Sequence, residues 1–515
     1  MTRTSTANII DTLRADNADL RERLGKTSRE LAQCKAQIAW FQRQLFGQRS
    51  EKLSTITDLQ QGWLFSSNDD APPSDKQPET DTITITRRRK FRDNAVTDSG
   101  LRFDPDVPVK VIRAALPEGV TEDDVIDWRR THRLAQSKSD YIVIEHQHPV
   151  IKDPETAEVT SVPAPAGLFP GSFADVSFIA GMLIDKYLYH RPLNRQHQRL
   201  EQAGITISRS GMVTLANRGI DLLDPIAEAL LEIILESAVL TVDETPIKVG
   251  PGVDGKLKQG WLWPIHGEDG EIFFLFDPGR GTTVISNVIP EDFQGVLLTD
   301  GYTVYSRLAR MRPNFIHAVC WLHTRRKFVD AIKTEQAAQE CLLHIREMYR
   351  QEALIRKEGL EGEEKRAARR ARCLPAAEAF WAVCDSVMQR TDLEPSHPLM
   401  KAVGYACKRR NELMVCFNNP DVPLDTNHVE RANRPVAMGK RNWLFAGNEE
   451  GARRIGIIQS LLASCRLQGI DPRTWLIDVL QRVGCHPASR VHELTPRLWK
   501  QHFADCPLGS DVDTS

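Results

Sequence analysis

The sequence predicts a multidomain protein that is partly all-α and partly mixed α/β. Three observations support this class. The N-terminus carries a heptad pattern, the middle of the chain a helix–turn–helix pattern, and the second half strand patterns joined by helical ones. At 515 residues the chain also exceeds the usual length of one domain.

Composition excludes some classes of protein. The 67 Lys and Arg residues are balanced by 69 Asp and Glu residues, so only local basic patches can indicate nucleic-acid binding. The chain has no apolar run of about 18 residues, as a membrane span needs, and its first residues do not resemble a signal peptide. Ten cysteines form no CxxC pair, which is typical of reduced thiols in the cytoplasm.

Residues 6–50 are predicted to form a coiled coil. Mostly apolar residues alternate spacings of three and four, and Asn17 in this seam can fix the register. We expect self-association, and the alternative is a helix that packs on its own protein. The seam positions are Ile10, Leu13, Asn17, Leu20, Leu24, Thr27, Leu31, Cys34, Ile38, Phe41 and Leu45.

Two segments without candidate catalytic residues follow. Residues 51–100 are predicted to be a disordered, basic linker, because 66–82 is acidic and proline-containing and 87–92 holds five cations. Those cations suit phosphate contacts or a solvated patch equally well. Residues 101–170 are predicted to be a small β-containing unit, since Val109–Ile112 and Tyr141–Glu145 have strand character.

Residues 171–235 are predicted to be helical, with a helix–turn–helix pattern for DNA binding. A helix over Pro192–Gln202 is followed by a turn at Ala203-Gly204, and Ser208 is a suitable N-cap for a second helix through Asn217. A basic helix pair can dock in a major groove, although generic helical hairpins are common. Its arginines are Arg191, Arg195, Arg199, Arg209 and Arg218.

Residues 236–484 are predicted to form the catalytic core. Three hairpin-linked strand patterns are followed by alternating helix and strand, which predicts a mixed α/β sheet. A long helical insertion covers about 330–420, and its charged stretch Ile355–Arg372 is expected to be a solvated face. A final helix begins near Asp425 or Thr426, helices follow at 449–466 and 472–483, and 485–515 is expected to be a tail.

Two aspartates end buried strand patterns in this core. Asp243 follows Val239–Val242, and Asp300 follows Val296–Thr299. Carboxylates at the ends of adjacent strands can converge at one sheet edge, where a metal ion removes the cost of burying them. Glu244 is an alternative to Asp243, but successive strand residues point to opposite faces, so we expect only one of them to serve.

Glu430 is the candidate for a third ligand. It shares one helical face with Asn427, Arg431 and Arg434, which suits a metal beside a phosphate backbone. Two Mg²⁺ or Mn²⁺ ions about 4 Å apart then perform in-line phosphoryl transfer. Taken singly, either aspartate can merely end a strand, and Glu430 can be a surface ion-pair partner.

The stretch 317–328, HAVCWLHTRRKF, is interpreted as a strand that leads into a basic helix. His317, Cys320 and His323 provide only three zinc ligands, so we favour Arg325 and Arg326 as DNA contacts. The DNA-binding candidates are Arg191, Arg195, Arg209, Arg325, Arg326, Asn427, Arg431, Arg434, Lys440 and Arg441.

The chain resembles the large transposase of the insertion-sequence 66 family of bacterial mobile elements. The segments that carry the resemblance are LFGQRSEKL (45–53), KYLYHRPLNRQ (186–196), VDETPIKV (242–249), LLTDGYTVY (297–305), HAVCWLHTRRKF (317–328), DTNHVERANRPVAMGKRNWLFAGNEEGA (425–452) and DPRTWLIDVLQRV (471–483).

The resemblance implies a ribonuclease-H-like core whose Asp-Asp-Glu triad is Asp243, Asp300 and Glu430. It further implies an N-terminal coiled coil, a helix–turn–helix region and two small accessory proteins as partners. Many relatives carry a cysteine-rich zinc element ahead of the helix–turn–helix region. Residues 84–190 contain no cysteine, so we expect no zinc here.

These observations together predict a DNA transposase that binds the terminal repeats of its element and target DNA. It is expected in the cytoplasm, at the nucleoid when bound to DNA. Two alternatives remain: a ribonuclease-H-like nuclease without strand transfer, and a non-catalytic DNA-binding repressor.

Overall fold

The computed structural model describes residues 101–118, 120–137, 140–152, 159–165, 167–250, 256–332 and 335–513. The predicted coiled coil at 6–50 and the linker at 51–100 lie outside the described residues. The described residues all belong to one compact unit. Among the helices described, none has both the length and the apolar character needed to cross a membrane.

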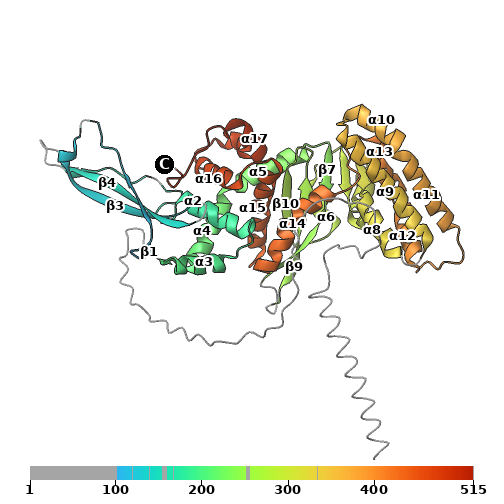
Figure 1. Cartoon of the computed structure of the whole chain (residues 1–515), viewed down its shortest axis with the longest axis horizontal. Helices are drawn as coiled ribbons and strands as arrows, with labels where there is room; N and C mark the ends of the chain where they lie inside the picture. The colour runs from blue at the N-terminus through green and yellow to red at the C-terminus, as the bar shows by residue number, and fades with distance from the viewer. Residues whose placement is uncertain are drawn as a thin grey trace, which may run out of the picture. The chain divides into compact units, whose positions relative to one another are not determined.

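The first described segment is a small sheet with the order β2-β4-β3, in which β5 also pairs with β4. The strands predicted at Val109–Ile112 and Tyr141–Glu145 are confirmed, and the second extends to Lys152. The short strand β1 (Figure 1) does not join this sheet. It pairs with β6, which lies in the turn of the helix–turn–helix segment. The elements are β1 (Arg102–Phe103), β2 (Val109–Arg113), η1 (Glu122–Asp124), β3 (Val125–Gln136), β4 (Tyr141–Lys152), β5 (Val159–Ser161) and β6 (Ile205–Thr206).

The next segment consists of helices, and its helix–turn–helix pattern is present. The Ser208 hydroxyl accepts a hydrogen bond from the Gly211 amide at 3.0 Å, so the predicted N-cap is confirmed. Gly204 has a φ of +82°, which a turn between two helices requires. The second helix continues beyond Asn217. The helices are α2 (Val176–Tyr187), α3 (Leu193–Gln202), α4 (Arg209–Leu222) and α5 (Asp224–Leu235).

The core contains the predicted mixed α/β sheet. Its strand order is β10-β9-β7-β11-β12, and β8 pairs with β9 beyond the end of β7. β10, β9 and β7 are antiparallel, whereas β7, β11 and β12 are parallel. The elements are β7 (Val239–Val242), β8 (Thr245–Val249), β9 (Lys258–His266), β10 (Ile272–Asp277), α6 (Thr282–Val288), β11 (Val296–Thr299), α7 (Thr303–Met311) and β12 (Ile316–Val319).

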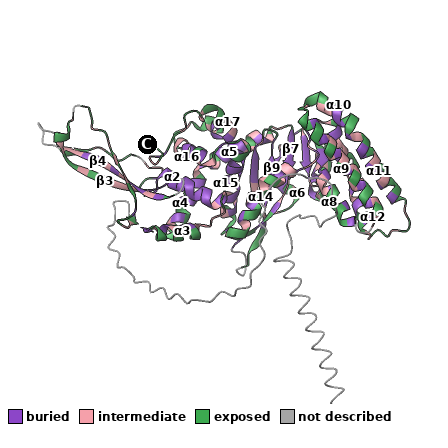
Figure 2. Ribbon diagram, in the orientation of Figure 1, coloured by how far each residue is buried: buried purple, intermediate pink, exposed green. Residues whose placement is uncertain are grey.

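Helix α15 (Glu449–Leu467) covers the outer strand β10. The Ser460 hydroxyl accepts a hydrogen bond from the Phe274 amide at 2.8 Å, and the Ser464 hydroxyl accepts one from the Ile272 amide at 3.1 Å. Because an edge strand otherwise leaves such amides unpaired, these serines complete the sheet. Figure 2 shows that both α15 and the strands beneath it are largely buried.

The predicted helical insertion follows β12, and its hydrophobic core, which includes Trp321 and Phe380, is continuous with sheet residues such as Leu298. One expectation about it was wrong, because the charged stretch Ile355–Arg372 is not wholly a solvated face. Arg369 is 1% exposed and forms an ion pair with Glu352 at 2.6 Å. The helices are α8 (Trp321–Ala331), α9 (Gln336–Lys357), α10 (Gly362–Arg372), α11 (Leu374–Met388), α12 (Pro398–Cys407) and α13 (Arg410–Asn418).

The chain then returns to the sheet. The final helix was expected near Asp425 or Thr426, and α14 begins at Asn427 with Thr426 as its N-cap. Residues 485–515 are more than a tail, because Trp499 is 2% exposed and its indole donates a hydrogen bond to Asp478. The helices are α14 (Asn427–Trp443), α15, α16 (Pro472–Arg482), η3 (Ala488–Leu494) and α17 (Pro496–His502).

Candidate active site

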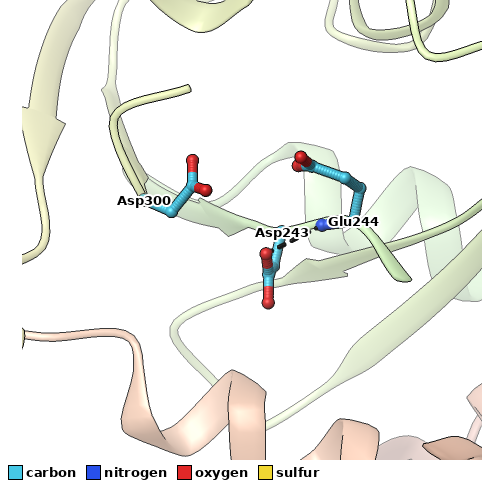
Figure 3. Close-up of side chains that lie close together, drawn as sticks. All are labelled: Asp243, Glu244 and Asp300. Carbon is cyan, nitrogen blue, oxygen red and sulfur yellow. Dashed lines mark hydrogen bonds between the residues drawn. The ribbon is translucent and has the colours of Figure 1, made fainter. Parts of the chain in front are cut away.

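The two aspartates lie at the ends of neighbouring parallel strands. Leu298 of β11 is in register with Thr241 of β7, so two residues further on Asp300 lies beside Asp243. One carboxylate oxygen of Asp243, Glu244 and Asp300 lies within 4.8 Å of one oxygen of each of the other two (Figure 3). The predicted convergence of Asp243 and Asp300 is therefore confirmed.

Glu244 also lies in this cluster, although we expected only one of Asp243 and Glu244 to serve as a ligand, and that choice stays a prediction. Figure 3 shows the carboxylates of Asp243 and Glu244 pointing to different sides, as strand alternation predicts. Both nevertheless lie close to Asp300. Strand β11 ends at Thr299, so beside Asp300 there is no β11 backbone to keep the side chains of the two sheet faces apart. Alternation along one strand therefore did not decide which carboxylates belong to the cluster.

The Glu244 carboxylate is held by two donors. The Arg280 guanidinium donates to Oε1 at 2.5 Å, and the Tyr305 hydroxyl donates to Oε2 at 2.9 Å. Arg280 is itself fixed between the rings of Trp261 and Tyr302, 4.4 and 4.2 Å from their centroids. Burial raises the pKa of Glu244, and the hydrogen bond from Arg280 opposes that shift. Nothing in the local sequence pattern distinguished Arg280, in the turn after β10, as part of this site.

The loop after β11 is braced by the helical insertion. The Asp300 carboxylate accepts a hydrogen bond from the Tyr302 amide at 2.7 Å, while its main-chain carbonyl accepts one from the Tyr405 hydroxyl at 2.7 Å. Arg409 donates to the Gly301 carbonyl at 2.9 Å. Gly301 has a φ of +82°, and a Cβ there would lie 2.8 Å from the Arg409 Nε. Only glycine suits this position, and the insertion thereby fixes Asp300.

The pKa of the Asp243 carboxyl group is strongly shifted by its surroundings. Burial raises its pKa to about 7, a hydrogen bond from the Glu244 amide opposes the shift, and the charges of Glu244, Asp300 and Glu430 add to it. Since its ordinary pKa is 3.8, the folded protein binds more protons than the unfolded chain between about pH 4 and pH 7. Stability should therefore fall as pH rises through this window, unless a cation neutralises the cluster.

We expect Asp243→Asn to stabilise the metal-free protein by roughly 2–4 kcal/mol at pH 8, because the amide carries no buried charge. Thermal unfolding in excess chelator from pH 4 to pH 8 measures this, and the gain should vanish near pH 4. Asp292→Asn is the matched control, since Asp292 is exposed. If the stability of Asp243→Asn depended on pH in the same way as that of wild type, the raised pKa of Asp243 would be wrong.

Glu430 is not part of the acidic cluster among the described residues. Its Oε2 accepts a hydrogen bond from Arg326 at 2.8 Å, and its Oε1 lies 3.8 Å from the His323 Nε2. Oε1 is buried and accepts no hydrogen bond within the part of the chain that the structure describes. Glu430 still contributes to the raised pKa of Asp243, so its charge acts on the site from α14.

The residues of the stretch 317–328 face different partners. His317 is hydrogen-bonded to the Thr299 hydroxyl at 2.9 Å, beneath the Asp300 loop. Cys320 is buried and accepts a hydrogen bond from the Thr426 amide at the start of α14. Arg325 is exposed, whereas Arg326 is the ion-pair partner of Glu430.

The other DNA-binding candidates fall into two groups. Some are tied to protein: Lys440 donates to the Thr245 hydroxyl at 2.8 Å, Asn427 donates to Asp425 at 2.9 Å, and Arg191 pairs with Asp185 at 3.0 Å. The exposed candidates are Arg195, Arg209, Arg431, Arg434 and Arg441. Exposure leaves the second group open to solvent and to any partner.

Comparison with known proteins places this chain in the class of the transposases. The family described as "Transposase IS66 family" matches residues 171–454, more than half of the chain. The chain therefore belongs to the IS66 family of transposases. The "IS66 C-terminal element" matches residues 460–497, and "Transposase C of IS166 homeodomain" matches residues 33–112, which indicates a DNA-binding region there.

Two relatives come from Sinorhizobium fredii (strain NBRC 101917 / NGR234). The uncharacterized protein y4jD is 28% identical over 509 residues, which cover 92% of this chain and 96% of that protein. The uncharacterized protein y4hP is 25% identical over 504 residues, covering 91% and 88% respectively. The similarity extends over nearly the full length of each chain.

Proposed function

We propose that this transposase cleaves and joins DNA strands with divalent metal ions held by Asp243, Asp300 and Glu430. The observation that carries the proposal is the convergence of partly buried carboxylates at the ends of two parallel strands in a chain of this family. The sheet order, three antiparallel strands followed by two parallel ones, supports assigning the core to the ribonuclease-H-like class.

The donor set suits Mg²⁺ or Mn²⁺. Carboxylate oxygens are the ligands that these ions prefer, and burial, together with nearby like charges, raises the pKa of Asp243 in the absence of a cation. Two ions bound here would supply an activated hydroxyl and stabilise the leaving oxygen of a phosphodiester. Cysteine is absent from the cluster, and zinc is not part of the proposal.

Each side chain has a role in this proposal. Asp243 and Asp300 hold the cations at the sheet edge. Glu430 would complete the site from α14 by releasing Arg326 and binding a metal ion in its place. Glu244 positions Arg280 beside the cluster, where the guanidinium faces an incoming phosphate. No covalent protein intermediate and no organic cofactor are needed.

The proposed partners are the element ends, target DNA, a second copy of the chain and two small accessory proteins, with action at the nucleoid. A homo-oligomer is proposed because two DNA ends must be brought together. The coiled-coil pattern at 6–50 offers the interface for it.

The deciding experiment presents purified full-length protein with pre-cleaved element ends and a supercoiled target plasmid. We expect joined products with Mg²⁺ or Mn²⁺, binding with poor turnover in Ca²⁺, and no product in excess chelator. Cleavage without joining would favour a nuclease, and DNA binding with neither reaction would favour a repressor. Full activity in chelator would exclude the metal mechanism.

A further inference from the structure

A polar pocket of about 540 Å³ lies where the segment between α2 and α3, helix α3 and the end of α14 meet. Its lining includes Tyr189, Arg191, Arg195 and Arg199 from the helix–turn–helix side and Asn442 from α14. The helices approach closely there, since a Cβ added to Gly439 would lie 3.3 Å from the His190 Nδ1. The pocket thus joins the helix–turn–helix segment to the helix that carries Glu430.

The lining of this pocket has excess positive charge. Arg191 is paired with Asp185, and Arg199 lies 3.8 Å from Asp140, a carboxylate that is 81% exposed. The side chain of Arg195 forms no ion pair or hydrogen bond with any described residue. The guanidinium of Arg195 is therefore available to an anion, whereas Arg199 also lies over the Tyr141 ring, 5.0 Å from its centroid.

The lining suits an oxyanion, and its place on the helix–turn–helix segment of a chain of this family favours a backbone phosphate over a carboxylate. Guanidinium groups match phosphate oxygens in a two-point fork, and amides such as that of Asn442 commonly donate to phosphate. Tyr189 is 67% exposed and can donate its hydroxyl at the rim. The volume exceeds that of a single ion, which suits one unit of a DNA strand passing through.

We propose that this pocket holds one backbone phosphate of the element DNA and thereby fixes the strand against both α3 and α14. The inference rests on the proposed function, because it places that phosphate relative to Glu430. From Glu430 to Asn442 is 442 − 430 = 12 residues, or about 18 Å along a helix. For a duplex that lies along α14, a rise of about 3.4 Å per base pair would place the held phosphate about five nucleotides from the bond that is cut.

The test measures binding in the absence of divalent metal, with labelled duplexes of the element end and of a scrambled sequence. Arg195→Ala should weaken both duplexes equally, by about tenfold, since a phosphate contact carries no sequence information. The slope of log K against log salt should become shallower by about 0.9. Arg370→Ala, an exposed arginine on α10, is the matched control and should leave both values unchanged.

A second measurement locates the phosphate. Neutral methylphosphonates are introduced one at a time along the duplex, and one position about five nucleotides from the cleavage site should weaken wild type but not Arg195→Ala. Arg195→Lys should keep most of the salt slope because it keeps the charge.

Two outcomes would overturn the inference alone: an Arg195→Ala protein that binds like Arg370→Ala, or an RNA duplex that binds more tightly than DNA through Arg195. Wild type that binds no duplex would overturn the proposed function as well. Cleavage by Asp300→Asn with an Arg195-dependent salt slope would remove the catalytic assignment and keep the pocket.

Discussion

Replacing Asp300 with asparagine will lower the rate of strand cleavage by about three orders of magnitude or more while leaving DNA affinity within about threefold of wild type. The amide keeps the shape of the side chain and can still accept the 2.7 Å hydrogen bond from the Tyr302 amide. It loses the negative charge that a divalent cation requires. Loss of several kcal/mol of transition-state stabilisation corresponds to that factor.

Binding should be spared because affinity for DNA comes chiefly from phosphate contacts made by basic side chains. The measurement pairs single-turnover cleavage of an element-end duplex with an equilibrium binding titration in Ca²⁺. Asp292→Asn serves again as the exposed control. If Asp300→Asn lost affinity in proportion to its loss of rate, the division between binding and chemistry would be wrong.

The Glu244→Gln variant tests whether Glu244, the fourth acidic residue near the site, positions Arg280 or binds a metal ion. As a positioning residue it should retain part of the cleavage activity, because glutamine still accepts the hydrogen bond from Tyr305 while it weakens the hold on Arg280. As an essential metal ligand it would fail as completely as Asp300→Asn.

The second large effect is on stability. Arg369→Leu should lower the stability of the helical insertion by about 3–5 kcal/mol, because it leaves the charge of Glu352 buried and unpaired. The two N–H groups of the Arg369 Nη1 are shared among four backbone carbonyl oxygens at 2.9–3.2 Å, at the end of α13 and just beyond it. Those carbonyls have no further helical turn to bond, so they too lose their donor.

Hydrogen exchange of the α9–α13 amides measures this local effect, which a single unfolding midpoint of a multidomain chain cannot isolate. Arg370→Ala, one residue away and exposed, is the control. The pair Arg369→Leu with Glu352→Leu should recover much of the loss, since no charge then stays buried. A single Arg369→Leu variant that exchanges like the control would refute the role given to the ion pair.

The insertion therefore supports the site, although its helices are far in sequence from Asp243. Tyr405 and Arg409 hold the loop that carries Asp300, and Arg369 holds the segment that leads to α14 and Glu430. Loosening the insertion should disturb two of the three proposed metal ligands together.

The sequence alone determined the local features of this protein. The cap at Ser208, the strands before Asp243 and Asp300, and the start of α14 all follow from patterns within about ten residues. The convergence of the two aspartates followed as well, because the ends of adjacent parallel strands share one sheet edge.

Only the tertiary structure decided which distant groups meet. Glu430 pairs with Arg326 across 104 residues, Arg280 reaches Glu244 across 36, and Arg369 is buried although its neighbours in sequence are charged. Helical periodicity defines a face but not its partner, and strand alternation ceases to separate two faces where the neighbouring strand ends. Such contacts depend on how whole elements pack, which no local pattern encodes.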